Sequence, residues 1–161
     1  MKKTLVFCTA CLMAISAISC TKDESTPLVD NGKYIDLGLP SGTKWKAQNE
    51  GIGYYTYTQA IDLFGNRLPD HDQFMELINK CVWTWSENGY NIVGPNGNSI
   101  TLPAAGCRFL DGSVSSEGIG GYYWSSTPDS PNYAWNLIFN SEVKGLRYYD
   151  RRGGLSVRLV K

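Results

Sequence analysis

The C-terminal quarter of the chain, residues 121–160, constrains the fold most strongly. It holds four strand-like runs separated by turn residues, at 121–126, 133–140, 145–152 and 154–160. In the second run the apolar Trp135, Leu137 and Phe139 alternate with Asn136 and Asn140. A period of two is typical of a strand with one buried and one exposed face. These runs therefore predict an antiparallel sheet whose outward face is polar.

Two short helices are expected before these strands. Thr58 is expected to cap a helix that ends at Gly65, and Asp70 with Gln73 forms a capping-box pattern for the second. The second helix has an apolar face made by Phe74, Leu77, Ile78 and Cys81. Strand-like runs lie at 33–37, 43–48, 82–85, 90–93, 99–102 and 107–109, and a loop is expected at 110–120. Because the helices come early and strands dominate later, the predicted class is α+β.

The N-terminus has the pattern of a targeting segment. Two lysines precede the mostly apolar residues 4–18, a stretch too short to span a bilayer comfortably. It ends at Ser19-Cys20, which resembles the lipobox of bacterial lipoproteins, in which the cysteine carries the lipid. The alternative is a plain secretory signal with an incidental cysteine. We therefore expect a signal peptide at 1–19, lipidation at Cys20 with a tether over 20–32, and a folded domain at 33–161.

The residues after Cys20 favour surface exposure. Residues 21–24 read Thr-Lys-Asp-Glu, which resembles the surface-export signal of Bacteroides-type lipoproteins. Lipid anchors of this kind hold a protein stably at a membrane. The expected location is therefore the outer membrane, with the domain facing outward.

The charge balance bears on the class of partner. Removal of residues 1–19 takes away Lys2 and Lys3 and no acids, so 15 basic residues become 13 against 15 acidic ones. The chain contains no basic run or stripe, and proteins that bind nucleic acid need one. A nucleic-acid partner is therefore not expected.

Two of the five cysteines belong to the expected mature domain. Cys8 and Cys11 leave with the signal, Cys20 is acylated, and Cys81 and Cys107 remain. In an oxidising compartment these two can form a disulfide, or they can be buried free thiols. Their spacing in the sequence does not decide between the two states.

Catalytic and metal-binding patterns are weak. The chain has one histidine, His71, without histidine or cysteine neighbours at the spacing of a zinc site. The acids that could serve glycoside hydrolysis lie in loop-like surroundings, where a raised pKa is not expected: Asp111, Glu117, Asp129 and Glu142. We therefore predict a protein that is not an enzyme and that uses no metal or cofactor.

The strongest functional pattern is the sequence Arg-Tyr-Tyr-Asp-Arg-Arg at residues 147–152. Tyrosine and arginine are enriched in binding surfaces because each combines a large contact area with a directional polar group. The alternative is a solvated strand whose side chains shield the core. The candidate ligand-binding residues are Asn132, Tyr133, Trp135, Asn136, Asn140, Arg147, Tyr148, Tyr149, Asp150, Arg151 and Arg152. Asn136, Ile138 and Asn140 are expected to point outward.

An ordered set of short phrases resembles the Fibrobacter succinogenes major paralogous domain (FISUMP). The matching phrases lie at residues 34–43, 67–69, 83–85, 94–99, 102–106, 123–127, 139–141 and 156–158, so that the resemblance covers about residues 33–161. The resemblance implies a C-type lectin-like fold, with two short helices packed on small antiparallel sheets, long loops and adjacent chain ends. It also implies a surface or secreted recognition domain.

The resemblance gives the expected function a more specific form. Some relatives with this fold carry residues on their last strands that are diversified by a retroelement, and residues 132–155 lie at that place. The chain lacks the acidic pairs of calcium-dependent lectins. We therefore expect a lipoprotein that binds a glycan or a protein ligand. Alternatives are a structural subunit of a surface assembly or fimbria-like adhesin and, more remotely, a relative of formylglycine-generating enzymes that uses Cys81 and Cys107.

Overall fold

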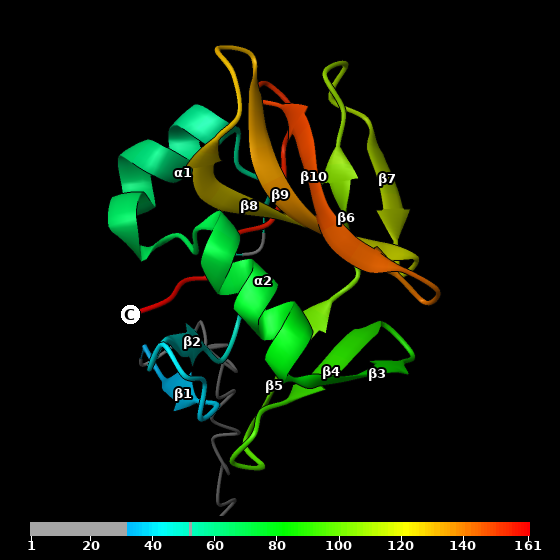
Figure 1. Ribbon diagram of the computed structural model, residues 1–161. Coiled ribbons are helices and arrows are strands. Elements are labelled where there is room, and N and C mark those ends of the chain that lie inside the picture. The colour runs from blue at the N-terminus through cyan, green and yellow to red at the C-terminus, as the bar shows by residue number, and fades with distance from the viewer. Residues whose placement is uncertain (1–31, 52) are drawn as a thin grey trace, which may run out of the picture.

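The computed structural model describes residues 32–51 and 53–161 (Figure 1). The expected signal peptide, the lipidation site Cys20 and nearly all of the expected tether lie outside the described residues. No helix within the described part of the chain is long and apolar enough to cross a membrane.

The structure is α+β, as predicted, with two short helices and three small sheets. The helices are α1 (Tyr57–Phe64), followed by the single-turn 3₁₀ helix η1 (Gly65–Arg67), and α2 (His71–Lys80). The strands are β1 (Tyr34–Asp36), β2 (Lys44–Lys46), β3 (Val82–Ser86), β4 (Gly89–Val93), β5 (Ser99–Pro103), β6 (Ala105–Arg108), β7 (Val114–Glu117), β8 (Gly120–Pro128), β9 (Tyr133–Asn140) and β10 (Lys144–Asp150).

The strands form sheets in the orders β1-β2, β3-β4-β5 and β10-β9-β8-β6-β7. Helix α2 contacts β8, β9 and β10, and in Figure 1 it runs from the five-stranded sheet towards the three-stranded one. All strand pairs are antiparallel except β6 with β8, which meet in parallel where Gly106 pairs with Gly121. Beyond that pair, the β6–β7 hairpin diverges from β8 (Figure 1).

Both helices begin at a capping box, but one cap differs from the prediction. Asp70 accepts from the backbone N–H of Gln73 at 2.7 Å, and the Gln73 side chain accepts in return from Asp70 N, which confirms the second cap. The cap of α1 is Thr56, not Thr58. Thr56 is correct because Gln59 lies three residues later and can complete the reciprocal pair.

The side chains of β8 and β9 alternate between two hydrophobic cores. The first core lies towards α2 and the three-stranded sheet and includes Phe74, Leu77, Ile92, Leu102, Tyr123, Leu137, Phe139 and Leu146. The second lies towards α1 and the C-terminal segment and includes Tyr57, Ala60, Leu68, Cys107, Trp124, Ala134, Leu155, Val157 and Leu159. These central strands are therefore covered over much of both faces, not on one face as their alternation predicted.

The last residues of the chain connect the parts of the fold. They form no regular strand, which corrects the fourth predicted run, but isolated bridges join Leu155 to Tyr55 and Val160 to Trp45. A third bridge, from Ser156 to Tyr123, is parallel. Residues 153–160 are buried throughout. The C-terminal segment is therefore part of the scaffold, and Val157 and Leu159 belong to the second core.

Candidate functional site

The predicted binding residues divide between the two faces of the β9–β10 pair. In the register of these strands Tyr148 lies opposite Trp135, whereas Arg147 lies opposite Asn136. Successive side chains of a strand point to opposite faces. The predicted residues therefore form two separate groups and not one continuous surface.

The first group is an aromatic face made by His71, Tyr133, Trp135 and Tyr148. Ring centroids lie 5.2 Å apart between His71 and Trp135, 6.3 Å between Trp135 and Tyr148, and 5.8 Å between Tyr148 and Tyr133. Each pair meets edge to face, the arrangement that ring quadrupoles favour. Tyr148 is 60% exposed and Tyr133 41% exposed, while Trp135 is half-buried against the first core. The face thus offers several aromatic groups to solvent from a rigid base.

Arg151 supports one end of the aromatic face. Arg151 donates from Nε to the carbonyl oxygen of Tyr133 at 3.1 Å, and its backbone N–H donates to the carbonyl oxygen of the exposed Asn132 at 2.9 Å. Its guanidinium carbon lies 4.8 Å from the ring centroid of Tyr57, a cation–π contact. Arg151 therefore holds the residues that lead into β9, and its contacts are structural.

The ion pair of Asp150 and Arg152 flanks the same face. Arg152 donates to the Asp150 carboxylate from Nη2 at 2.7 Å and from Nε at 3.0 Å. The hydrogen bonds from the Arg152 side chain, and to a smaller extent the one from the Arg152 backbone N–H, lower the pKa of Asp150 to about 2. The carboxylate is therefore ionised at neutral pH, and it remains a hydrogen-bond acceptor beside the tyrosines.

His71 belongs to the aromatic face but was not among the predicted binding residues. It is the first residue of α2, where its backbone N–H donates to Thr127 Oγ1 at 2.9 Å and its Nδ1 lies 3.1 Å from Asp72 Oδ1. The sequence placed it in the first turn of a helix. Its neighbour Trp135 is more than 60 residues away, and no local signal marks that contact.

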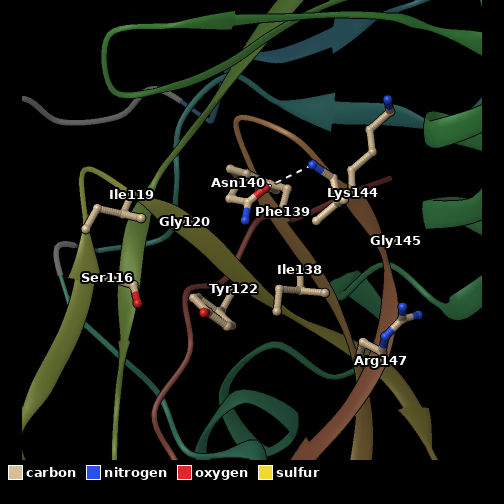
Figure 2. Close-up of a pocket in the computed structure, with 11 residues that line it drawn as sticks. Ser116, Ile119, Gly120, Tyr122, Ile138, Phe139, Asn140, Lys144, Gly145 and Arg147 are labelled. Carbon is tan, nitrogen blue, oxygen red and sulfur yellow. Dashed lines mark hydrogen bonds between the residues drawn. The ribbon is translucent and has the colours of Figure 1, made fainter.

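The second group lines a pocket on the opposite face of the pair. Arg147 and Asn140 line it together with Ile138, as the outward orientation of Ile138 and Asn140 predicted. Figure 2 shows these side chains with Tyr122 of β8, and with Ser116 and Ile119 across the opening. The pocket has a volume of about 320 Å³.

Besides Arg151, two further predicted binding residues are structural. Asn136 was expected to point outward but is 1% exposed, because the second core covers the middle of this face of β9. Its Oδ1 has no hydrogen-bond partner within the described residues. Tyr149 packs half-buried against the second core, 6.2 Å from the Trp124 ring, and burial raises the pKa of its phenol.

Cys81 and Cys107 are free thiols, so the disulfide alternative is not realised in the structure. Cys81 packs against the first core at the end of α2, and Cys107 is buried in the second. Burial raises the pKa of the Cys81 thiol to about 11 and also raises that of Cys107, beside which the Tyr149 hydroxyl lies at 3.9 Å. Both thiols are therefore poor nucleophiles at neutral pH.

This arrangement predicts that a reducing agent leaves stability unchanged. For a chain that begins at residue 20 and carries Cys20→Ser, we expect the same Tm with and without dithiothreitol. A thiol-reactive dye should modify two cysteines in denaturant and react slowly in the native state, because Cys107 is buried, Cys81 is half-buried and both thiols have a raised pKa. A Tm that falls on reduction would contradict the assignment of free thiols.

The described residues contain no group of three or more histidine, cysteine, aspartate or glutamate side chains arranged to hold a metal ion. The aromatic face and the pocket instead supply rings, a guanidinium group and amide and hydroxyl groups. This chemistry is suited to non-covalent binding.

A comparison with protein families identifies one relationship. The family described as a domain of unknown function, DUF8237, matches residues 69–160. No curated protein and no solved structure matches the chain. The family match covers more than half of the chain and includes α2, β8, β9 and β10, the elements that carry the aromatic face and most of the pocket. The chain therefore belongs to the DUF8237 family.

Proposed function

We propose that this chain is a non-enzymatic binding domain that recognises a glycan or protein ligand through its aromatic face. The observation that carries the proposal is the chain of contacts from His71 through Trp135 and Tyr148 to Tyr133. Much of both tyrosine rings is exposed to solvent, although most other large apolar side chains on these strands are buried in the two cores. Exposed aromatic groups that gather in one place are typical of interaction sites.

The composition of the face fits binding on energetic grounds. Tyrosine and tryptophan supply a large contact area and lose little side-chain entropy, since each has only two rotatable side-chain bonds. Here Trp135 is already fixed by the first core and by His71, which lowers the entropy lost on binding. The neighbouring Asp150 and Arg152 offer an acceptor and donors to polar groups such as the hydroxyls of a sugar.

The proposal includes attachment to the outer membrane through a lipid on Cys20, with the domain outside the cell. It also includes kinship with FISUMP domains and the C-type lectin-like fold. Two short helices on small sheets support this kinship, as do the adjacent ends of the domain, where Lys161 Nζ lies 4.6 Å from the ring centroid of Tyr34. Ends that lie together would leave the aromatic face free when the N-terminal side is tethered.

The experiment compares variants on arrays of cell-surface glycans and proteins. In the chain from residue 20 with Cys20→Ser, we expect the double variant Tyr133→Ala, Tyr148→Ala to bind its array ligand at least about ten-fold more weakly than the parent protein. The Tm should change by only a few degrees, since both rings are largely outside the cores.

The matched control is the double variant Leu63→Ala, Val82→Ala, which removes two exposed apolar side chains from α1 and β3. It should bind as the parent protein does. Equal binding by the tyrosine double variant, or an equal loss in the control, would show that the aromatic face is not the recognition surface.

A further inference from the structure

The pocket on the other face of the β9–β10 pair has walls of two different kinds. Ile119, Ile138, Val143 and the ring of Tyr122 supply apolar surface, and Ile119 and Val143 are largely exposed. In Figure 2, Ile119 and Ser116 lie on one side and Ile138 and Arg147 on the other, with Tyr122 between them. The volume of about 320 Å³ corresponds to roughly ten waters, at about 30 Å³ each in the liquid, and suits a ligand with about that many non-hydrogen atoms.

The polar groups of this pocket are chiefly hydrogen-bond donors. Asn140 Oδ1 already accepts from the backbone N–H groups of Glu142 and Val143, both at 2.9 Å, so its amide nitrogen is the end left to donate. Ser116 and Tyr122 add hydroxyls. No acidic residue lines the pocket, because Glu142 lies outside it and Glu117 accepts at 3.1 Å from the Tyr54 hydroxyl elsewhere.

Arg147 is the cation that this pocket presents. Its Nη1 donates to the carbonyl oxygen of Leu146 at 2.9 Å, and it forms no ion pair within residues 32–51 and 53–161. Lys144 also lines the pocket, but its ammonium group lies 5.7 Å from the ring centroid of Trp83 and 5.9 Å from that of Tyr90, two rings that pack with the first core on the other face of the sheet. The remaining guanidinium donors of Arg147 match the geometry of a carboxylate, which accepts two parallel hydrogen bonds.

The backbone at the rim has an unusual conformation. Ser116 has φ of 64°, the only positive value at a non-glycine position among the described residues. Non-glycine residues adopt this region at some cost, and such residues often gather at binding sites. Here the conformation occurs at a residue whose side chain lines the pocket.

We propose that this pocket binds a small monocarboxylate with an apolar body. The carboxylate pairs with Arg147 and accepts from the Asn140 amide, and the body lies against Ile119, Ile138 and Tyr122. A phosphate fits less well, since one free guanidinium among apolar walls replaces little of its hydration. The site is separate from the aromatic face and its occupation does not depend on the function proposed there.

The test uses 3-phenylpropionate as the probe and 3-phenylpropionamide as its neutral counterpart, followed by ¹H–¹⁵N NMR. In the chain from residue 20 with Cys20→Ser, the acid should shift the backbone resonances of Ile119, Tyr122 and Ile138. The amide should bind at least about ten-fold more weakly, because it cannot form the charge-assisted pair.

One arginine variant and one lysine variant make the test specific. Arg147→Met should weaken binding of the acid at least about ten-fold, whereas the matched Lys144→Met should stay within about two-fold. The double variant Tyr133→Ala, Tyr148→Ala should bind the probe as the parent protein does. No shift at tens of millimolar acid, equal binding of acid and amide, or unchanged binding by Arg147→Met would each overturn the proposal.

Discussion

Replacement of Gly106 by alanine is expected to lower the free energy of unfolding by about 4 kcal/mol or more. Gly106 has φ of +72° and is the residue of β6 that pairs with β8. A Cβ at this position would strike the carbonyl oxygen of Ser115 and lie 2.8 Å from Glu117 N, closer than real Cβ atoms approach. β7 would have to move away from β6, the strand that joins it to the rest of the sheet.

Gly42 is a matched control that isolates the strain of the left-handed backbone conformation from the steric clash. Its φ of +75° is nearly the same, but nothing lies within 4 Å of a Cβ built there. Gly42→Ala should therefore cost only the strain of the left-handed region, about 1–2 kcal/mol. Urea denaturation followed by circular dichroism measures both losses. Equal losses at the two positions would mean that β6 and β7 can separate without cost.

Arg158→Met is expected to lower the free energy of unfolding by about 3–5 kcal/mol. The side chain is 1% exposed, although it carries a permanent charge. It donates to four acceptors at 2.7–3.0 Å: Asn49 Oδ1 and the carbonyl oxygens of Lys46, Ala47 and Thr101. Methionine fills much of the space but removes these hydrogen bonds, of which the one to the Lys46 carbonyl oxygen is buried and the others are part-buried.

For a domain of this size the loss corresponds to a fall in Tm of roughly 10–20 °C. The control is Arg67→Met, since Arg67 is exposed and its side chain makes one hydrogen bond, to the carbonyl oxygen of Leu63 at 3.2 Å, and one cation–π contact, 5.9 Å from the ring centroid of Phe64. This control should change the Tm by no more than about 3 °C. Similar effects at the two arginines would show that the C-terminal segment does not hold the parts of the fold together as described.

Local sequence signals predicted much of the fold because they depend on neighbouring residues. The capping box of Asp70 and Gln73 and the alternation in β9 are of this kind, and both appear in the structure. The Thr56–Gln59 pair has the same spacing as Asp70–Gln73 and could have located the α1 cap. β7 was missed because its sequence, Val-Ser-Ser-Glu, has no apolar alternation, and it is a strand only because β6 pairs with it.

The sequence predicted only part of the candidate site, because local patterns do not show which distant segments pack on a strand. Alternation identified which residues share a face of β9, but not what covers each face. Asn136 therefore appeared exposed, while α1 and the C-terminal segment, both distant in sequence, enclose the second core beside it. His71 reaches Trp135 only through the packing of α2 on the sheet, so the aromatic face could not be assembled from its residues alone.

The two sites explain why the motif at residues 147–152 combines several roles. Tyr148 belongs to the aromatic face, and the Asp150–Arg152 pair flanks it. Arg147 lines the pocket, and Tyr149 and Arg151 hold the scaffold. The side chains of this motif therefore differ in the effects that substitutions have on binding and on stability. Changes at Tyr148 or Arg147 should alter binding with little loss of stability, and changes at Tyr149 should destabilise the fold.

The most direct test of the binding role follows the five tryptophans. Labelled with ¹⁹F-tryptophan, the chain from residue 20 with Cys20→Ser should give five resonances, of which Trp135→Phe identifies one. On titration with a ligand found on the arrays, the Trp135 resonance should move, while those of the buried Trp45 and Trp124 remain in place. A ligand that binds without moving the Trp135 resonance would contradict recognition by the aromatic face.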